Sequence, residues 1–328
     1  MKLPLVLGLI GASILYGQKI EMNFPKFSGK SYDFVLFQGA QTKVVFQGVI
    51  PEDGKFILNV PQEYSSYVGM SRWLITGTKE GGGLDMFIPG KDFSVSCDSE
   101  TPSESNIIYK DNAYNGELNV LYKKQEQNLN RYETLLQATK VFSKNDPHYD
   151  YNFFTKGLAR EKKSYSVFQD DLNKKGDYIS QFIQIVNVTR GLGTELSEDE
   201  KQRAVNVNHY VVDALNWDYL YTSGHWYSVI NSWLGIQTQV FKTPSVFKAD
   251  FLKISSKLKS PEMYRDFTER VAYYLKEQKA QDYISAIAPL VRDSGRIADY
   301  IAPLDIYAEG YKDSEESGAE AKSNVSIN

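Results

Sequence analysis

The stretch GGGLDMFIPGKDFSVSCD, residues 81–98, combines glycines and a lysine in the manner of a phosphate-binding loop. Such a loop needs Gly-x-x-x-x-Gly-Lys-Ser/Thr between a strand and a helix, so that backbone amides at the helix N-terminus meet the phosphate. Here Lys91 is followed by Asp92, whose carboxylate repels phosphate, and the pattern continues as a strand. The sequence therefore favours a turn and strand entry at Gly81–Gly83 over a phosphate site.

Cys97, the single cysteine, ends the same stretch. A reactive thiol needs a nearby cation or a helix N-terminus, together with access to solvent. Cys97 instead shares the apolar face of a strand pattern with Phe93 and Val95, which predicts a buried side chain. A lone cysteine forms no internal disulfide, and the sequence has no Cys-x-x-Cys pair for redox chemistry.

The three histidines, His148, His209 and His225, have no second histidine or cysteine at metal-ligand spacing. The sequence also lacks the Gly-x-Ser-x-Gly pattern of a nucleophile elbow. We therefore predict no metal, no cofactor and no catalytic residue from motifs. A nucleophile–base pair assembled across the fold, between a β and an α domain, stays open as an alternative.

Residues 208–233, NHYVVDALNWDYLYTSGHWYSVINSW, are rich in aromatic side chains. Trp217, Tyr221, Trp226 and Trp233 are the candidate ligand-contact residues, because exposed rings beside polar groups can stack on a sugar or a peptide. The alternative, which the spacing favours, is that these rings form the buried core between two helices joined at Ser223-Gly224.

Length, charge and the N-terminus limit the class of protein. The 328 residues suggest about two domains, and a net charge of −4 provides no basic field for nucleic acid. Lys2 followed by the apolar run Leu3–Leu15 predicts a signal peptide over residues 1–17, cleaved before Gln18. No later stretch approaches about 18 consecutive apolar residues, so we expect no transmembrane span in the mature chain.

Residues 18–98 alternate apolar and polar side chains, which predicts an antiparallel β-sandwich-like domain. Turn residues at Pro51–Gly54 and at Pro89-Gly90 predict hairpins between the strand patterns on either side. The fold class is therefore α+β, since the patterns after residue 116 are helical. The predicted strands cover residues 19–24, 33–37, 44–50, 55–60, 71–76, 84–88 and 93–97.

A polar segment, residues 99–115, predicts a linker to an α-helical domain over residues 116–308 with about seven helices. Ser197 with Glu200 forms a capping-box pattern, and Thr243 and Ser260 each precede a proline, as N-cap residues do. The acidic, small residues 309–328 predict a disordered tail.

Two motifs of the β region resemble a known family. They are Gly54-Lys55-Phe56 after a turn and the later run IPGKDFSV at residues 88–95. Over residues 18–98 the chain is similar to the N-terminal domain of unknown function 4369 in envelope proteins of Bacteroidota. The resemblance implies a helical linker domain after it and then a thioredoxin-like domain. No cysteine follows Cys97, so the redox activity of that last domain does not carry over.

The resemblance and the predicted leader together suggest an exported periplasmic or envelope protein. The first hypothesis is a non-catalytic accessory or truncated relative of thioredoxin-like thiol-disulfide proteins, which binds an envelope protein, a thioredoxin-like protein or a peptide. The second hypothesis is a glycan- or small-ligand-binding protein that uses residues 208–233. The third is an enzyme with a site at the β/α interface.

Overall fold

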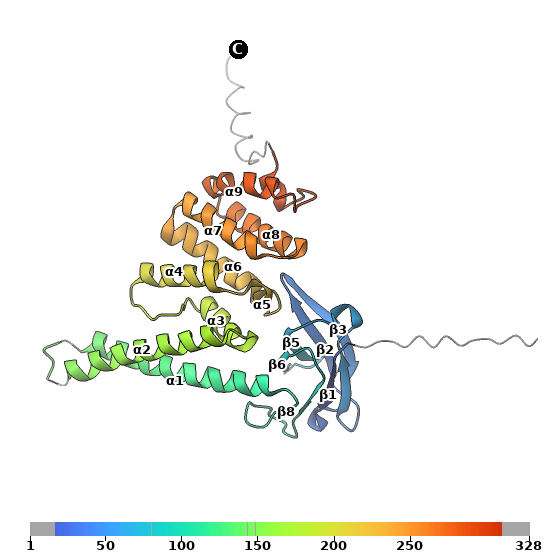
Figure 1. The fold of residues 1–328 in the computed structure, drawn as a ribbon. Coiled ribbons are helices and arrows are strands. Elements are labelled where there is room, and N and C mark those ends of the chain that lie inside the picture. The colour runs from blue at the N-terminus through green and yellow to red at the C-terminus, as the bar shows by residue number, and fades with distance from the viewer. Residues whose placement is uncertain (1–16, 80, 143, 148, 310–328) are drawn as a thin grey trace, which may run out of the picture. The chain divides into compact units, whose positions relative to one another are not determined.

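A computed structural model describes residues 17–309, apart from 80, 143 and 148. Except for Gly17 and Glu309, the predicted signal peptide and the predicted tail lie outside these described residues. The strands precede the helices along the chain (Figure 1), which confirms the α+β class with an N-terminal β domain. The chain divides into a β unit, up to Leu36 and over Lys43–Gly116, and a helical unit, Phe37–Thr42 and from Glu117 onward.

Eight strands form two four-stranded sheets in the described part of the β unit. The first sheet has the order β4-β1-β7-β8 and the second the order β3-β2-β5-β6. All the pairs with a resolved register are antiparallel except β1 with β7, which is parallel. The strands are β1 (Lys19–Asn23), β2 (Ser31–Gln38), β3 (Gln41–Val49), β4 (Lys55–Asn59), β5 (Gly69–Thr76), β6 (Gly83–Ile88), β7 (Phe93–Ser96) and β8 (Ile108–Lys110).

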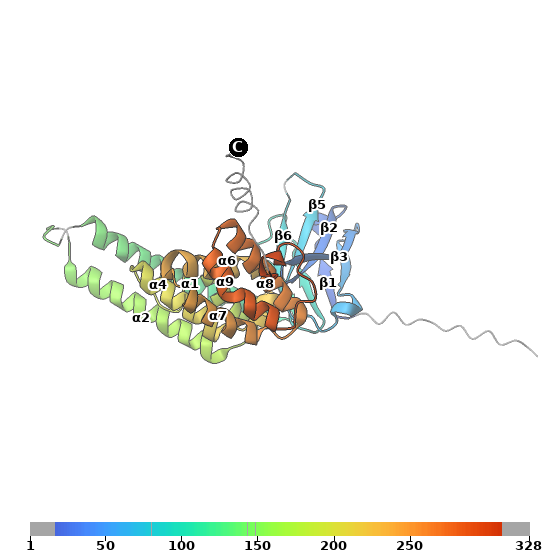
Figure 2. The ribbon, with the colours of Figure 1, turned by 90° about the horizontal axis from the view of Figure 1, so that it is seen from above.

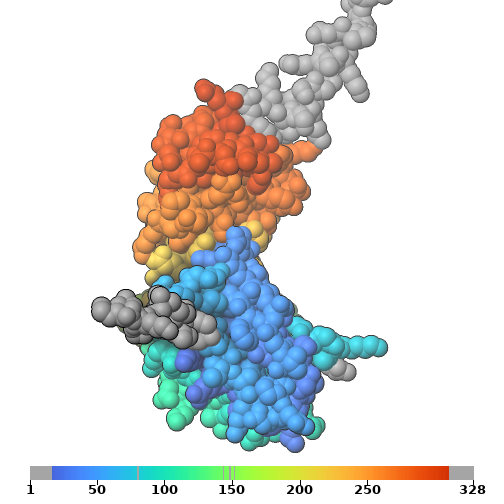
Figure 3. All heavy atoms as spheres, turned by 90° about the vertical axis from the view of Figure 1, so that its right-hand side faces the viewer, coloured from blue at the N-terminus to red at the C-terminus, as the bar shows by residue number. Residues whose placement is uncertain are grey.

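The inward faces of both sheets form one hydrophobic core, as the alternating patterns predict. Met22, Phe34 and Trp73 are each at most 3% exposed. Cys97 is 2% exposed in this core, which confirms the prediction that its side chain is buried. Figure 3 shows atoms of the β unit, in blue, on the face turned toward the viewer.

The two predicted hairpins are wrong, because each turn joins strands of different sheets. At Pro51–Gly54 the chain passes from β3 of the second sheet to β4 of the first sheet. At Pro89-Gly90 it passes from β6 of the second sheet to β7 of the first sheet. Period-two patterning specifies which face of a strand is buried, and it carries no information about the neighbour to which that strand pairs. Gly54 takes a positive φ of +75°, which glycine adopts without steric cost and which the turn requires.

The free edge of β6 is closed by side-chain amides that follow it in the chain. Asn115 Oδ1 accepts a hydrogen bond from the backbone N–H of Phe87 at 2.8 Å, and Asn112 Nδ2 donates to the carbonyl of Phe87 at 2.8 Å. These bonds occupy edge groups that could otherwise pair with a foreign strand. Residues 99–115, predicted as a linker, thus contain β8, both asparagines and the first residues of α1.

Nine α-helices are described in the C-terminal part. α1 and α2 form a long antiparallel pair (Figures 1 and 2). The α-helices are α1 (Ala113–Val141), α2 (Tyr151–Lys175), α3 (Tyr178–Thr189), α4 (Glu200–His209), α5 (Trp217–Tyr221), α6 (Trp226–Gly235), α7 (Pro244–Lys257), α8 (Pro261–Glu277) and α9 (Gln281–Asp293). Short 3₁₀ turns are Pro25–Phe27, Gln62–Tyr64 and Leu304–Tyr307, and π-helical turns are Tyr210–Ala214 and Ile236–Phe241.

The helix caps follow the sequence in part. Ser260 caps α8 as predicted, since its hydroxyl accepts from the N–H of Met263 at 3.1 Å. The capping box at Ser197 is wrong: Asp199 is the N-cap of α4 and accepts from the N–H of Gln202 at 2.7 Å. A carboxylate two residues closer to the helix competes successfully with the hydroxyl. Thr243 occupies the N-cap of α7, yet its side chain makes no capping bond.

Candidate functional site

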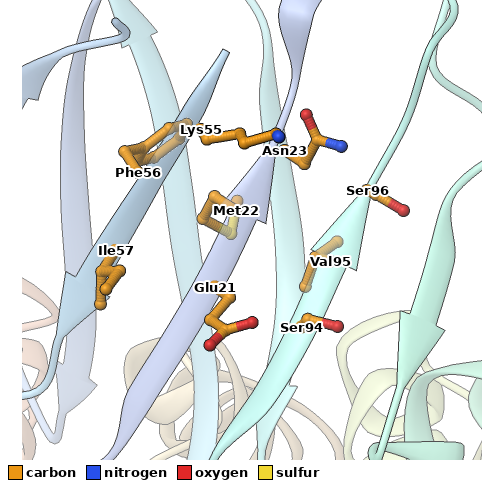
Figure 4. A pocket seen from close by; sticks show the side chains of 9 residues that line it. All are labelled: Glu21, Met22, Asn23, Lys55, Phe56, Ile57, Ser94, Val95 and Ser96. Carbon is orange, nitrogen blue, oxygen red and sulfur yellow. The ribbon is translucent and has the colours of Figure 1, made fainter. Parts of the chain in front are cut away.

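The outer face of the first sheet carries a hollow of about 540 Å³ across β4, β1 and β7 (Figure 4). β1 is the middle strand of the three, and the alternation of its side chains decides what lines the hollow. Met22 points into the core and is 2% exposed, so Glu21 and Asn23 on either side of it point outward. On β7, Ser94 and Ser96 likewise alternate with the buried Val95.

The strand register arranges these outward side chains in two rows. Glu21 lies between Ile57 of β4 and Ser94 of β7. In the second row Asn23 lies between Lys55 and Ser96. The side chain of Lys55 extends toward Asn23 across the strands in Figure 4.

The hollow offers hydrogen-bonding groups of several kinds. Two hydroxyls, an amide, the carboxylate of Glu21 and the ammonium of Lys55 face it, and Ile57, 45% exposed, adds an apolar edge. Within the described residues neither Glu21 nor Lys55 forms an ion pair. The face can therefore bind a polar ligand that carries both charged and neutral groups.

A second, smaller hollow of about 170 Å³ continues this polar face toward β8. It shares Glu21 and Ser94 with the first and adds Lys19, Asp92 and Lys110. Lys110 is the β8 partner of Ser94 in the sheet register. The candidate site thus extends over all four strands of the first sheet.

The predicted ligand-contact residues of the aromatic segment lie mainly inside the helical unit. Trp217, Trp226 and Trp233 are 2%, 1% and 0% exposed and belong to its main hydrophobic core. Trp217 packs edge-on against Trp226, with ring centroids 5.6 Å apart. Tyr221 is half-buried, and burial raises the pKa of its hydroxyl to about 12, with the nearby charge of Asp266 adding to the effect.

The local sequence explains why these rings face inward. Asn216 caps α5, because its side-chain oxygen accepts from the N–H of Asp218 at 3.0 Å. Gly224, with φ at +79°, then lets the chain turn sharply into α6. Trp217 and Trp226 therefore meet from two short helices, as the core interpretation expects.

An exposed aromatic cluster lies on α6 and α8, and of its two rings Tyr227 belongs to the aromatic segment 208–233 whereas Tyr273 lies outside it. The guanidinium carbon of Arg270 lies 4.8 Å from the ring centroid of Tyr227 and 5.2 Å from that of Tyr273. These rings are 44% and 51% exposed. Arg270 Nε donates to Asn231 at 2.6 Å, which fixes the guanidinium plane. Tyr227 follows Trp226 directly, so its side chain is turned by about 100° around α6 from that buried ring, and this offset is the signal that the sequence contained.

The histidines have different environments. His209 lies 2.9 Å from the carboxylate of Asp213, which Lys253 also contacts at 3.1 Å. The ring of His225 packs 5.6 Å from that of Phe182, and His148 lies outside the described residues. In the described part of the chain, no three of His, Cys, Asp and Glu gather closely enough to hold a metal ion.

No protein-family model matches the chain, and no curated protein and no solved structure is significantly similar to it. Of the described helices, none combines the length and the apolar character that crossing a bilayer requires.

Proposed function

We propose that this is an exported envelope protein that holds a polypeptide partner on the outer face of the β4-β1-β7-β8 sheet. The apolar N-terminal run and the motifs shared with domain of unknown function 4369 support the envelope location and the relationship. In this proposal the protein acts by binding, as an accessory relative of thioredoxin-like proteins.

The two rows of polar side chains on that sheet carry the proposal. Glu21 and Asn23 are two residues apart on one strand, a spacing of about 7 Å. An extended peptide that runs along β1 places the side chains of one of its faces at the same interval. Glu21 and Lys55, which form no ion pair with a described residue, supply one charge of each sign, so they can select the direction of such a peptide.

Site-specific photo-crosslinking tests this proposal. A benzoylphenylalanine at position 94 places the reactive group in the hollow, and the same residue at the exposed Ser245 of α7 serves as the control. In the cells that make the protein, we expect one discrete crosslinked protein from position 94. That product should decrease at least tenfold in a Glu21→Ala/Asn23→Ala background. Equal products from positions 94 and 245, or products indifferent to the double substitution, would refute partner binding at this face.

The exposed Tyr227 and Tyr273 favour a second candidate, a glycan or small ligand that stacks at the aromatic segment. The ligand would contact these tyrosine rings and the terminal nitrogens of Arg270. A glycan array probed with the protein and with Tyr227→Ala tests it. Binding that Tyr227→Ala abolishes supports this candidate, while binding that the substitution leaves unchanged places the ligand elsewhere.

A further inference from the structure

A groove between α1 and α2 joins two hollows of different character. The first, of about 540 Å³, is lined by Leu135, Phe153 and Gly157 among others. The second, of about 330 Å³, is lined by Lys124, Lys163 and their neighbours. Arg160 lines both. The α2 residues of the two hollows recur at spacings of three and four, so the hollows follow one side of that helix.

The first hollow has a mainly apolar lining and lies where α2 presents a glycine to α1. A Cβ at Gly157 would lie 3.2 and 3.3 Å from the two methyl carbons of Leu135, so the helices approach closely there. At the edge of this hollow Phe153 is 64% exposed, and its ring lies edge-on to that of Phe154, with ring centroids 5.4 Å apart. An exposed phenyl ring beside an apolar hollow is a surface that another apolar side chain can cover.

The second hollow has a surplus of positive charge. The acids of the groove are paired: Glu161 lies 3.0 Å from Arg131. Asp171 lies 3.9 Å from Lys174.

The cations of this hollow have no ionic partner among the described residues. Lys124, Arg160 and Lys163 form no ion pair with any residue in the described ranges. Lys124 Nζ lies 4.9 Å from the ring centroid of Phe168, which holds this charge at the hollow. Lys124 of α1 and the α2 cations Arg160 and Lys163 are about 40 residues apart in the sequence, so only the fold brings their charges together.

We infer that this groove binds an acidic segment of a partner protein. One large apolar side chain of the segment occupies the hollow at Leu135 and Gly157, and its carboxylates meet Arg160, Lys163 and Lys124. From Gly157 to Ser164 the helix rises about 10 Å. An extended chain covers this distance in about three residues. The segment therefore carries its acidic residues about three positions from the apolar one.

Two features favour an acidic peptide over a free anion or an anionic membrane as the ligand of this groove. A free anion would leave the apolar hollow empty, and a bilayer is too flat to enter two concave hollows between helices. This inference concerns the helical unit alone, so it stands or falls independently of the proposal for the β sheet.

Selection from a random dodecapeptide phage library on the purified full chain tests the inference. We expect enriched peptides with a large apolar residue and two or more acids about three positions away. An enriched peptide should bind the double variant Arg160→Ser/Lys163→Ser at least tenfold more weakly than it binds the wild-type protein. The control Lys201→Ser/Lys248→Ser removes the same charge from exposed lysines of α4 and α7 and should bind normally.

Enrichment of peptides without acids, or peptides that bind the two double variants equally, would overturn the inference. A second arm measures cosedimentation with vesicles that contain phosphatidylglycerol. If the vesicles bind in a manner that depends on Arg160 and Lys163, and no acidic peptide is enriched, the groove is a membrane-contacting surface instead. Phe153→Ser, in which the charges are intact, should weaken peptide binding severalfold. Circular dichroism of each variant establishes that it is folded.

Discussion

The side-chain amides of Gln125 and Asn187 form a reciprocal pair of hydrogen bonds inside the helical unit. Gln125 Nε2 donates to Asn187 Oδ1 at 2.8 Å, and Asn187 Nδ2 donates to Gln125 Oε1 at 2.9 Å. Gln169 of α2 also donates to Gln125 Oε1, at 3.0 Å. All three residues are at most 1% exposed. These three amides therefore fix the register of α1, α2 and α3, because sliding of one helix along another would leave buried amides without partners.

Replacing one member of this pair should destabilise the helical unit strongly. Gln125→Leu deprives both polar atoms of Asn187 of their Gln125 partner in a place that water does not reach. Each unsatisfied buried group costs about 1–3 kcal/mol, so we expect the free energy of unfolding to fall by about 2–4 kcal/mol. Urea unfolding followed by circular dichroism at 222 nm, which reports on the helices, measures this change.

Gln127→Leu provides the matched control, since Gln127 is exposed on the same helix. It should change the unfolding free energy by less than about 0.5 kcal/mol. The double variant Gln125→Leu/Asn187→Leu should lose less than the sum of the two single variants, because it removes both partners together. Additive losses would show that the two amides do not act as a pair.

Gln125 also shows where sequence reasoning ends. In the sequence it is a polar interruption between Leu118 and Leu129 in the apolar stripe of a helix. The stripe correctly predicts that this face is buried. Its partner Asn187 is 62 residues away, and no local pattern connects the two. The prediction of a hairpin at Pro89-Gly90 is wrong for the same reason, because tertiary packing and not the local pattern decides which strands pair.

The same limit applies to the candidate site on the sheet. Alternation of Ser94 and Ser96 with Val95 predicts correctly that the serines face outward. Their neighbour Glu21 comes from a strand more than 70 residues earlier, paired in parallel. Sequence therefore predicts which side chains of each strand face outward, whereas only the fold brings the strands together to form the rows.

The tryptophans should be inaccessible to water-soluble quenchers. All four, Trp73 included, are at most 3% exposed. We expect iodide to quench the native emission very little and to quench it strongly after unfolding in urea, when the indoles meet solvent. Steady-state fluorescence with increasing iodide measures both. A saturable change in native emission on adding a soluble glycan would contradict this expectation and would place an indole at a ligand site.

The thiol of Cys97 should react slowly in the native protein. Its side chain is 2% exposed and lies among Phe93, Val95 and the rest of the β-sandwich core. Sγ lies 3.5 Å from Asn106 Oδ1, an acceptor that does not favour the thiolate. At neutral pH we expect an aromatic disulfide reagent to label Cys97 at least a hundredfold more slowly than in urea. Rapid native labelling would reopen a redox role for the chain.

Glu198 should make the helical unit sensitive to acid. A hydrogen bond from Lys162, 2.7 Å away, lowers the pKa of the Glu198 carboxyl, and the hydroxyl of Tyr132 adds a second bond at 3.2 Å. A lowered folded-state pKa stabilises the fold above the unfolded pKa of about 4.5, and that stability is lost as the pH falls through the folded pKa. Because both side chains are about a third or more exposed, the gain is below about 1 kcal/mol.

Glu198→Gln should therefore lower the unfolding free energy at about pH 7, and the difference from the wild type should shrink toward zero at about pH 3. Urea unfolding of both proteins at the two pH values measures this convergence. Glu195→Gln is the control, because Glu195 and Glu198 both line a hollow beside Tyr132, and Glu195 forms no ion pair with a described residue. A Glu198→Gln deficit that stays constant with pH would mean that lost packing, rather than the carboxylate charge, causes it.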